Sequence, residues 1–364
     1  MLTNHFKLTP DNPPNEGILF VDHQKHNRSG HLGHAMVEYA PGKILAFFPN
    51  CSSVDTRWNG HSGHGWMEFK RSLDGGDTWS EPMIEPNSKA LFDDSGETRS
   101  FMCEKAVVTD TGRIVLFYLK CDIETEGHIW EPFMEPHFAI SDDGGETFSK
   151  TKPLTDQAAR IYDARYHDGV IYVMAQNGTF CGNFFGECDD HSMHLYVSTD
   201  NGETFTHRSE INFDRSDHSF YGTMIFQPDG RLFAYTYDEY DEYNLKYNVS
   251  DDCGMTWGLP RRAFFEKRIR NPQIAYFGGM YLIHGRSGSW GEEDPKGHFI
   301  AYTSPDGIHW DEGQYLRMRE AHAGSYSNNL IVHHPDGRER LLIQTSHAYE
   351  LAKTNLLLYW VDKK

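Results

Sequence analysis

Two pairs of histidines near the start of the chain carry the clearest chemical signal. Two residues separate the histidines of each pair, in His31-Leu-Gly-His34 and His61-Ser-Gly-His64. Imidazole titrates near neutral pH and binds metal ions when neutral, so the four side chains could serve acid/base catalysis, contact a substrate or hold a metal ion. Gly-His turns that only bond backbone are the alternative. We expect no cofactor, although the four histidines could hold a metal ion, and a carboxylate such as Asp55 joining them would strengthen that interpretation.

A repeated turn motif determines the expected fold. The segment Ser72-Leu-Asp-Gly-Gly-Asp-Thr-Trp79 follows the pattern S-x-D-x-G-x-T-[WF], which returns at residues 141, 198 and 250, with a shorter copy at 304. An Asp followed by Gly two residues later suits a tight turn, and the final Trp or Phe can pack that turn onto a sheet. The spacing of the copies is close to the length of a propeller blade, roughly 40–50 residues.

Apolar alternation broken by Gly, Pro and Asp predicts short strands throughout the chain, with no helix longer than a turn or two. We count six blades, which makes residues 1–364 a single all-β propeller domain. Residues 1–30 form a lead-in, and its strand at residues 17–21 is predicted to close the ring by pairing with the last blade, which ends at residues 356–361. That last blade has no copy of the turn motif.

Composition limits the partners. Lys and Arg number 34 against 53 Asp and Glu, which gives a formal charge of −19. This charge argues against nucleic acid and anionic membrane as partners, although a local arginine cluster could still bind a small anion. No run of 18 apolar residues and no leader-like start are present, so a soluble, cytoplasmic protein is expected. Six cysteines without CxxC spacing predict free thiols, with Cys181 and Cys188 as a possible pair. The sequence does not set the oligomeric state.

In a propeller, the first strand of every blade runs along the central channel, so its opening residues converge on one funnel. Polar rim positions can simply be wet, but Arg and Tyr recur at several openings, which favours a polar ligand. Glu104 and Asp163 fall on inner strands, where burial would raise a carboxyl pKa toward an acid/base role. The other candidates for substrate contact at these openings are His31, Arg99, Arg160, Arg165, Tyr221, Arg270 and Asn271, together with His61 from the second histidine pair.

The repeated motif resembles the Asp box, or BNR repeat, of the sialidase-like β-propeller superfamily, and the resemblance covers nearly the whole chain. It implies a six-bladed propeller with the boxes on the outer rim, away from the active site. Sialidases bind the substrate carboxylate with three Arg and use a Tyr nucleophile assisted by Glu, with an Asp as general acid. By this resemblance Tyr326 corresponds to the tyrosine, as nucleophile or general base, and Arg270 or Arg286 to one carboxylate-binding arginine.

Other family positions differ. Leu32-Gly-His34 replaces the opening Arg-Ile-Pro, and the His61 to His64 segment stands where the acidic loop is expected. Tyr221 and Tyr237 stand about where the Glu and its partner Arg are expected. His, Tyr and Arg on a propeller rim are also similar to the polysaccharide lyases that act on uronate glycans, although those usually have seven blades.

Three functions therefore follow from the sequence. The first is a sialidase-like exo-glycosidase that releases a terminal, acidic sugar from a small oligosaccharide. The second is a lyase that acts by His/Tyr β-elimination, and the third is a non-catalytic glycan-binding propeller. For an enzyme we expect His34 or His64 as acid/base and Glu104 and Asp163 as supporting carboxylates. Arg165, Arg270 and Arg286 would bind the carboxylate or hydroxyls of the sugar.

Overall fold

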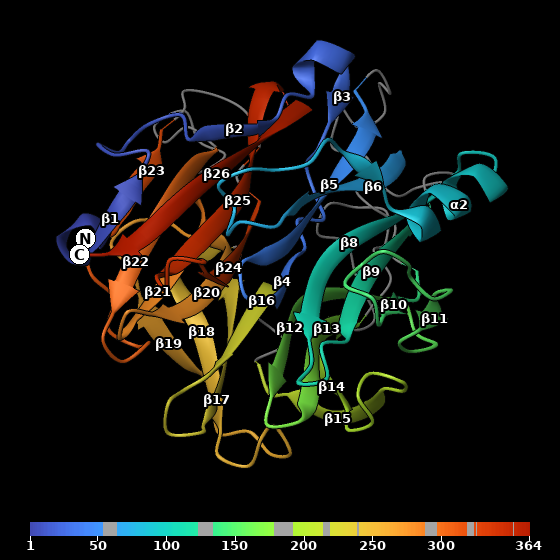
Figure 1. Cartoon of the computed structure of the whole chain (residues 1–364). Coiled ribbons are helices and arrows are strands. Elements are labelled where there is room, and N and C mark those ends of the chain that lie inside the picture. Colours follow the sequence, from blue (N-terminus) through green and yellow to red (C-terminus); the bar gives the residue numbers. More distant parts are fainter. Residues whose placement is uncertain are drawn as a thin grey trace.

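The chain folds into six antiparallel sheets arranged as the blades of a propeller (Figure 1), which confirms the expected fold class. The computed structural model describes residues 1–53, 64–122, 134–177, 192–213, 219–238, 240–287, 297–318, 324, 326–351 and 353–364.

The first strand of each blade lines the central axis. Neighbouring first strands contact one another in sequence order, and the last contacts the first, so together they close a ring. These inner strands are β4 (Met36–Ala40), β8 (Arg99–Val108), β12 (Ala159–His167), β16 (Ser219–Phe226), β20 (Arg270–Phe277) and β24 (Ser327–His333).

The remaining strands follow outward in each blade (Figure 1). The second strands are β5 (Lys43–Ser52), β9 (Ile114–Asp122), β13 (Val170–Asn177), β17 (Leu232–Asp238), β21 (Met280–Ser287) and β25 (Glu339–Glu350). The third strands are β6 (Gly65–Ser72), β10 (His137–Ser141), β14 (Met193–Ser198), β18 (Asp241–Ser250), β22 (His298–Ser304) and β26 (Lys353–Lys363). The outer strands are β7 (Met83–Ile84), β11 (Lys152–Pro153), β15 (Thr206–Ile211), β19 (Arg261–Phe264) and β23 (Gln314–Arg317).

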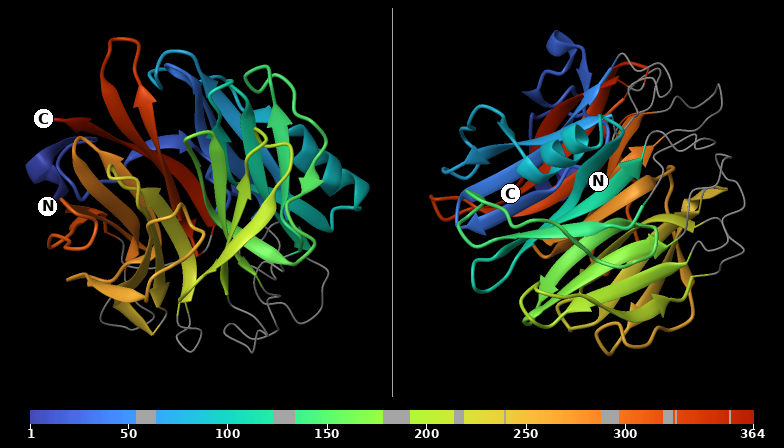
Figure 2. Two further views of the ribbon diagram at one scale, coloured as in Figure 1. Left: turned by 90° about the horizontal axis from the view of Figure 1, so that it is seen from below. Right: turned by 90° about the vertical axis from the view of Figure 1, so that its right-hand side faces the viewer.

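The N-terminal segment completes the sixth blade. Strand β2 (Ile18–Val21) pairs with β26, as the sequence predicted, and β1 (Phe6–Thr9) adds a second pairing with the same strand. The two chain ends therefore lie at the same edge of the molecule (Figure 2). Short elements surround this closure: helix α1 (Leu2–His5), the 3-10 helix η1 (Gln24–His26) and strand β3 (Arg28–Ser29), which pairs with β5.

The core lies between the blades. In β9 every side chain from Ile114 to Leu119 is buried, because both faces of the blade pack against a neighbouring sheet. One apolar cluster joins Phe47 of the first blade to Tyr118 of the second, and another joins Phe117 of the second to Val173 of the third. Burial on both faces explains why the second strands read as continuous apolar runs in the sequence.

The Asp boxes form the turns between the third and the outer strands, on the outer rim as expected. In the first box, the Ser72 hydroxyl donates to Asp74 Oδ1 at 2.8 Å, and the Thr78 N–H donates to the same oxygen at 2.9 Å. The Gly76 N–H donates to Ser72 Oγ at 2.8 Å. Gly76 has φ of +89°, and a Cβ there would lie 2.5 Å from the Trp360 ring, so both backbone and packing require glycine.

Each box also bonds to the preceding blade. Arg71 of the first blade donates to the carbonyl oxygens of Gly144 and Gly145 in the second box. Arg113 of the second blade pairs with Glu203 of the third box at 2.6 Å. The sequence motif predicted the turns, and the structure assigns them a second role as connectors between blades.

One helix was not predicted from the sequence. Helix α2 (Pro86–Asp94) has nine residues and packs on β6 and β8. Glu85 caps it by accepting the N–H groups of Asn87 and Ser88, and Pro86 occupies the first turn, where a missing N–H costs nothing. The prediction of no helix beyond a turn or two was therefore wrong, because capping and packing stabilise a helix whose apolar period is weak. No helix in the described ranges is long and apolar enough to cross a membrane.

Candidate active site

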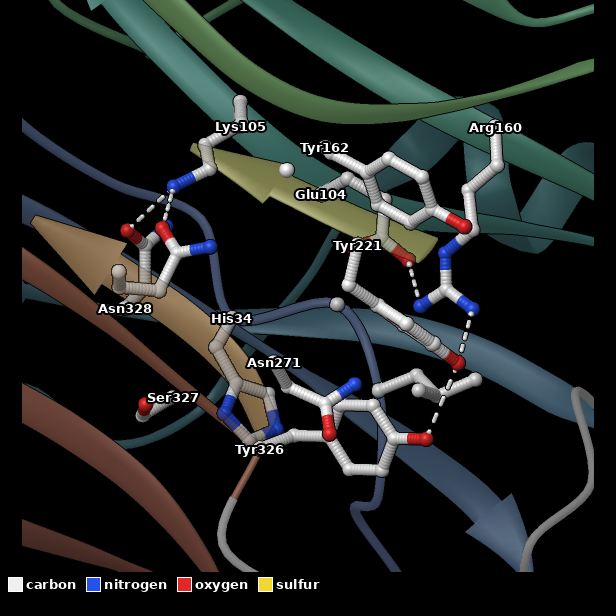
Figure 3. Close-up of a pocket in the computed structure, with 14 residues that line it drawn as sticks. His34, Glu104, Lys105, Arg160, Tyr162, Tyr221, Asn271, Tyr326, Ser327 and Asn328 are labelled. Carbon is white, nitrogen blue, oxygen red and sulfur yellow. Dashed lines mark hydrogen bonds and ion pairs between the residues drawn. The ribbon is translucent and has the colours of Figure 1, made fainter. Parts of the chain in front are cut away.

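A pocket opens where the inner strands converge. Its lining comes from the segment before β4 and from five of the inner strands (Figure 3). The lining residues are Leu32, Gly33, His34, Glu104, Lys105, Arg160, Tyr162, Tyr221, Gly222, Asn271, Gln273, Tyr326, Ser327 and Asn328.

Backbone irregularities direct side chains into this pocket. The pairing registers of β8, β12 and β16 each skip one residue, and β20 has a longer irregularity between Arg270 and Gln273. A bulge interrupts the alternation of side chains along a strand, so the side chain of the bulged residue can point in a new direction. Bulges are therefore frequent beside active sites. Each of these four irregularities places one residue in the lining of the pocket: Glu104, Tyr162, Tyr221 and Asn271.

Two of the bulged residues have a left-handed backbone. Tyr221 has φ of +47° and Asn271 has φ of +50°. This conformation is a genuine outlier for a bulky residue such as Tyr, and such strain concentrates where the surrounding structure fixes a functional side chain. The local cost is of order 1–3 kcal/mol per residue.

A chain of hydrogen bonds runs through the pocket, and we call it the tyrosine–arginine chain (Figure 3). The hydroxyls of Tyr326 and Tyr221 lie 3.1 Å apart. Arg160 Nη1 donates to the Tyr221 hydroxyl at 3.1 Å, and Nη2 pairs with Glu104 Oε1 at 3.3 Å. Arg160 is 2% exposed, and its guanidinium also lies over the Tyr221 ring, 4.7 Å from its centre. The arginine can therefore stabilise negative charge on the Tyr221 oxygen.

Tyr326 lies between two further predicted site residues. The ring of His31 meets the Tyr326 ring edge-on, with centres 4.6 Å apart. The guanidinium of Arg286 lies 5.5 Å from the centre of the same ring. Among the described residues no carboxylate pairs with Arg286, so its charge is available to a ligand.

Arg270 occupies a neighbouring position but is more fully engaged. Its Nε lies 3.1 Å from Glu242 Oε1, and Nη2 donates to the Tyr237 hydroxyl at 3.2 Å. Tyr237 in turn stacks on Tyr221 at 5.9 Å. Arg270 therefore supports the ring that carries the Tyr221 hydroxyl.

A second group in the pocket, the amide cluster, consists of Lys105, Gln273 and Asn328. Lys105 Nζ donates to Gln273 Oε1 and, at 2.7 Å, to Asn328 Oδ1 (Figure 3). It also lies 3.4 Å from Asp163 Oδ1. Burial lowers the pKa of Lys105 to about 8, with Asp163 acting in the opposite direction. The ammonium is therefore the predominant form at neutral pH.

Asp163 lies outside the lining of the pocket and is occupied by its neighbours. Its Oδ2 accepts from Arg165 Nη2, from the Thr223 hydroxyl and from the Met224 N–H, at 2.8–2.9 Å. Burial raises the pKa of Asp163, but Arg165, Lys105 and these hydrogen bonds outweigh burial and lower it overall. The carboxylate is therefore ionised and holds two cations in place.

His34 and His64 lie in different surroundings. His34 lines the pocket and its Nε2 lies 3.1 Å from the Gly30 carbonyl, whereas His64 packs against Phe92 of α2 at 5.4 Å. Burial lowers the pKa of His34 to about 4, so it is neutral at pH 7. The described residues contain no group of three or more His, Cys, Asp or Glu that could hold a metal ion. His61 and Asp55 lie outside the described residues, so a metal ion held by the histidines stays a prediction.

The structure brings together most of the predicted site residues. The pocket lining includes His34, Glu104, Arg160, Tyr221, Asn271 and Tyr326, while His31, Arg286, Arg270, Asp163 and Arg165 adjoin it through the contacts above. Arg99 is separate, since it is largely exposed at the start of β8 and pairs with Asp122 at 3.7 Å. Among the described residues, Cys51, Cys103, Cys121 and Cys253 form no disulfide with one another, and Cys181 and Cys188 lie outside the described residues.

Three contributors were missed. Lys105 and Gln273 line the pocket, and Glu242 holds Arg270, yet the sequence analysis selected none of them. Lys105 follows Glu104 directly, and strict alternation would place the two on opposite faces of β8. The bulge at Glu104 brings both to the pocket. A lysine within a predicted inner strand was the signal that could have identified it.

The fold is that of the sialidase-like six-bladed β-propellers. Solved structures with this arrangement include a protein of unknown function from Dyadobacter fermentans, with a TM-score of 0.68 and 14% identity over 96% of this chain and 98% of that one. A Hadza microbial sialidase gives 0.67 and 17% over 94% and 68%. The intramolecular trans-sialidase from Ruminococcus gnavus, in complex with oseltamivir carboxylate, gives 0.63 and 13% over 95% and 97%.

Sequence comparison points in the same direction. The chain is 25% identical over 289 residues to a sialidase from Paraclostridium sordellii, a match that covers 74% of this chain and 62% of that protein. The chain thus spans less than two thirds of the length of this curated relative. No protein-family model matches it.

Proposed function

We propose that the protein is a glycan-processing enzyme, a sialidase-like exo-glycosidase that releases a terminal acidic sugar from a small oligosaccharide. The observation that carries this proposal is the 3.1 Å contact between the hydroxyls of Tyr326 and Tyr221, next to Arg160. A tyrosine becomes a useful nucleophile when an adjacent group takes its proton. The similarity to a sialidase at 25% identity supports the same class of chemistry.

In the proposed reaction, the Tyr326 oxygen forms a bond to the anomeric carbon as the glycosidic C–O bond breaks. The step requires Tyr221 as the phenolate, a form that the adjacent Arg160 guanidinium would stabilise, so that the Tyr221 oxygen accepts the Tyr326 proton. Water then attacks the anomeric carbon of the tyrosyl sugar and releases a proton to the solvent, while the bond to Tyr326 breaks. Tyr221 then returns the proton to the Tyr326 oxygen, which restores both side chains to their starting forms. Arg160 and Glu104 hold the acceptor oxygen in place throughout.

The charge balance supports an acidic sugar. Five cations line or adjoin the pocket: Lys105, Arg160, Arg165, Arg270 and Arg286. Among the described residues, three carboxylates pair with them: Glu104, Asp163 and Glu242. Five cations gather here in a chain whose formal charge is −19, so their concentration is a specific feature of the pocket.

Asn271 supports a polar ligand as well. Its side chain lies beside Tyr326 (Figure 3), and neither amide atom has a hydrogen-bond partner among the described residues. An unsatisfied buried polar group costs about 1–3 kcal/mol. A sugar hydroxyl that donates and accepts at this position would remove that cost.

The leaving oxygen also needs a proton. His34 is a poor donor at neutral pH because burial holds its pKa at about 4. His64, the other predicted acid/base, packs against Phe92 of α2 and is not among the lining residues. We therefore propose that water supplies the proton to the leaving oxygen and that His34 is a substrate contact.

The proposal is tested by incubating the protein with sialyl- and uronate-terminated oligosaccharides and measuring the masses of the products by mass spectrometry. Hydrolysis gives products whose masses sum to substrate plus water. Tyr326→Phe and Tyr221→Phe should each lower turnover by at least about 10²-fold. An aryl glycoside, whose leaving group needs no proton, should be a substrate of the wild type but not of Tyr326→Phe. Full activity of Tyr326→Phe on every substrate would contradict the proposal.

A second candidate is β-elimination on a uronate. The observation that favours it is that the Tyr326 hydroxyl contacts a second tyrosine where sialidases have a glutamate. Asn271 could neutralise the uronate carboxylate while a tyrosine abstracts the C5 proton. Elimination gives products whose masses sum to the intact substrate, and one of them absorbs in the ultraviolet as an unsaturated uronate. Binding without any product, unaffected by His34→Ala, would instead indicate a non-catalytic propeller.

A further inference from the structure

The amide cluster has a fixed orientation. A lysine ammonium has three donors and no acceptor, so an amide that bonds to it must present its oxygen. Gln273 Oε1 and Asn328 Oδ1 both accept from Lys105 Nζ. Asn328 Oδ1 also accepts the N–H of Asn329 at 2.9 Å, a second bond that only an oxygen can make. The NH₂ groups of both amides are therefore turned away from the lysine.

These two NH₂ groups are unused donors. Among the described residues neither Gln273 Nε2 nor Asn328 Nδ2 has a hydrogen-bond partner, and both side chains line the pocket. Asn328 is 6% exposed, so its side chain is largely enclosed by the wall of the pocket. Both amides bond the same Nζ atom, so the two NH₂ groups belong to one cluster in the lining of the pocket.

The charges around the cluster favour the same ligand. Lys105 and Arg165 carry two positive charges against the single negative charge of Asp163. Glu104 is also close, but Arg160 neutralises it. A carboxylate placed at the two NH₂ groups would meet donors only and a net positive field.

We propose that this amide cluster binds the carboxylate of the acidic sugar, with Lys105 as the positioning residue that aligns the two amide donors. The inference rests on the proposed function only in its choice of ligand. It assigns the carboxylate to amide N–H groups of β20 and β24, while Arg270 remains engaged with Glu242 and Tyr237. Arg286 then adds a positive charge beside Tyr326, but it is not the principal contact of the carboxylate.

The test uses Asn328→Asp, which keeps the shape of the side chain and the oxygen that accepts from Lys105. The variant should fold, yet it replaces the NH₂ donor with a carboxylate oxygen. The matched control is Asn201→Asp, which makes the same change of charge on the exposed rim, in the third Asp box. Binding is measured by calorimetry with glucuronic acid and N-acetylneuraminic acid, each beside its methyl ester, so the readout does not require turnover.

We expect Asn328→Asp to weaken binding of the acids at least tenfold and of the esters much less, with Asn201→Asp at the wild-type value. Lys105→Met should lose most of the preference for acid over ester, and Arg286→Met should reduce acid affinity only a few fold. Equal behaviour of Asn328→Asp and Asn201→Asp, no binding of either acid by the wild type, or abolished acid binding in Arg286→Met alone would overturn the inference. If acids bind as expected but no glycan is cleaved, the inference stands and the proposed function fails.

Discussion

Replacement of Arg160 should reveal how strongly the tyrosine–arginine chain is coupled. Its Nη2 lies 3.3 Å from Glu104 Oε1, and the two side chains are 2% and 13% exposed. At an effective dielectric of about 20, this separation corresponds to roughly 5 kcal/mol of attraction before desolvation is subtracted. Removing one member of a buried pair typically costs about 3–5 kcal/mol, because the other charge stays buried.

We therefore expect Arg160→Met to lower the free energy of unfolding by about 3 kcal/mol. Glu104→Gln should cost less, and the double variant should be more stable than the sum of the single costs predicts, by about 2 kcal/mol. Urea unfolding of the wild type, the two single variants and the double variant completes the double-mutant cycle. Arg99→Met is the matched control, since Arg99 is largely exposed and its pair with Asp122 is worth at most about 1 kcal/mol. Additive costs, within about 0.5 kcal/mol, would refute the coupling.

Three further predictions follow from named contacts. Hydrogen bonds from Thr147 hold the pKa of Asp143 at about 2, so its contribution to stability is complete above pH 4 and is lost as the pH falls through 2; urea midpoints from pH 5 to pH 2 should fall less steeply in Asp143→Asn. Arg113→Ala removes the bonds from the second blade to the third box, and thermal unfolding should show a lower midpoint than in wild type, whereas an unchanged midpoint would exclude the box as a connector. Burial lowers the pKa of Lys105 to about 8, so between pH 8 and the pKa of Lys105 in the unfolded chain the unfolded state binds more protons than the folded state. The stability of wild type relative to Lys105→Met should therefore rise with pH over this range. The affinity of the wild type for acidic sugars should decline over the same range.

The repeated motif predicted the blades because it depends only on local bonding. Ser, Asp, Gly and Thr within eight residues make the Asp-box turn without help from distant segments, as the bonds of Ser72 and Asp74 show. The closing strand predicted at residues 17–21 rested on a different argument, since a propeller closes its ring by pairing a terminal strand with the last blade, and β2 does pair with β26. Helix α2 was not predicted, because its cap at Glu85 and its packing on β8 outweigh a weak helical period.

The site was predictable in outline but not in detail. Strand openings identified Arg160, Tyr221 and Tyr326 as neighbours, because propeller geometry brings inner strands together. The sequence does not reveal bulges, which depend on how each strand pairs with the next, and a bulge decides that Lys105 shares the pocket with Glu104. His64 packs against Phe92 of α2, a helix that the apolar pattern did not predict, and His64 is not among the lining residues of the pocket.

The most direct test of the central claim is to look for a covalent sugar on Tyr326. The protein is mixed with an aryl glycoside of an acidic sugar, denatured within the first turnover, digested and weighed by mass spectrometry. The account predicts one added sugar residue on the peptide that contains Tyr326, absent from Tyr326→Phe and reduced in Tyr221→Phe. Turnover by hydrolysis without any sugar on that peptide, or with the sugar on another residue, would contradict it.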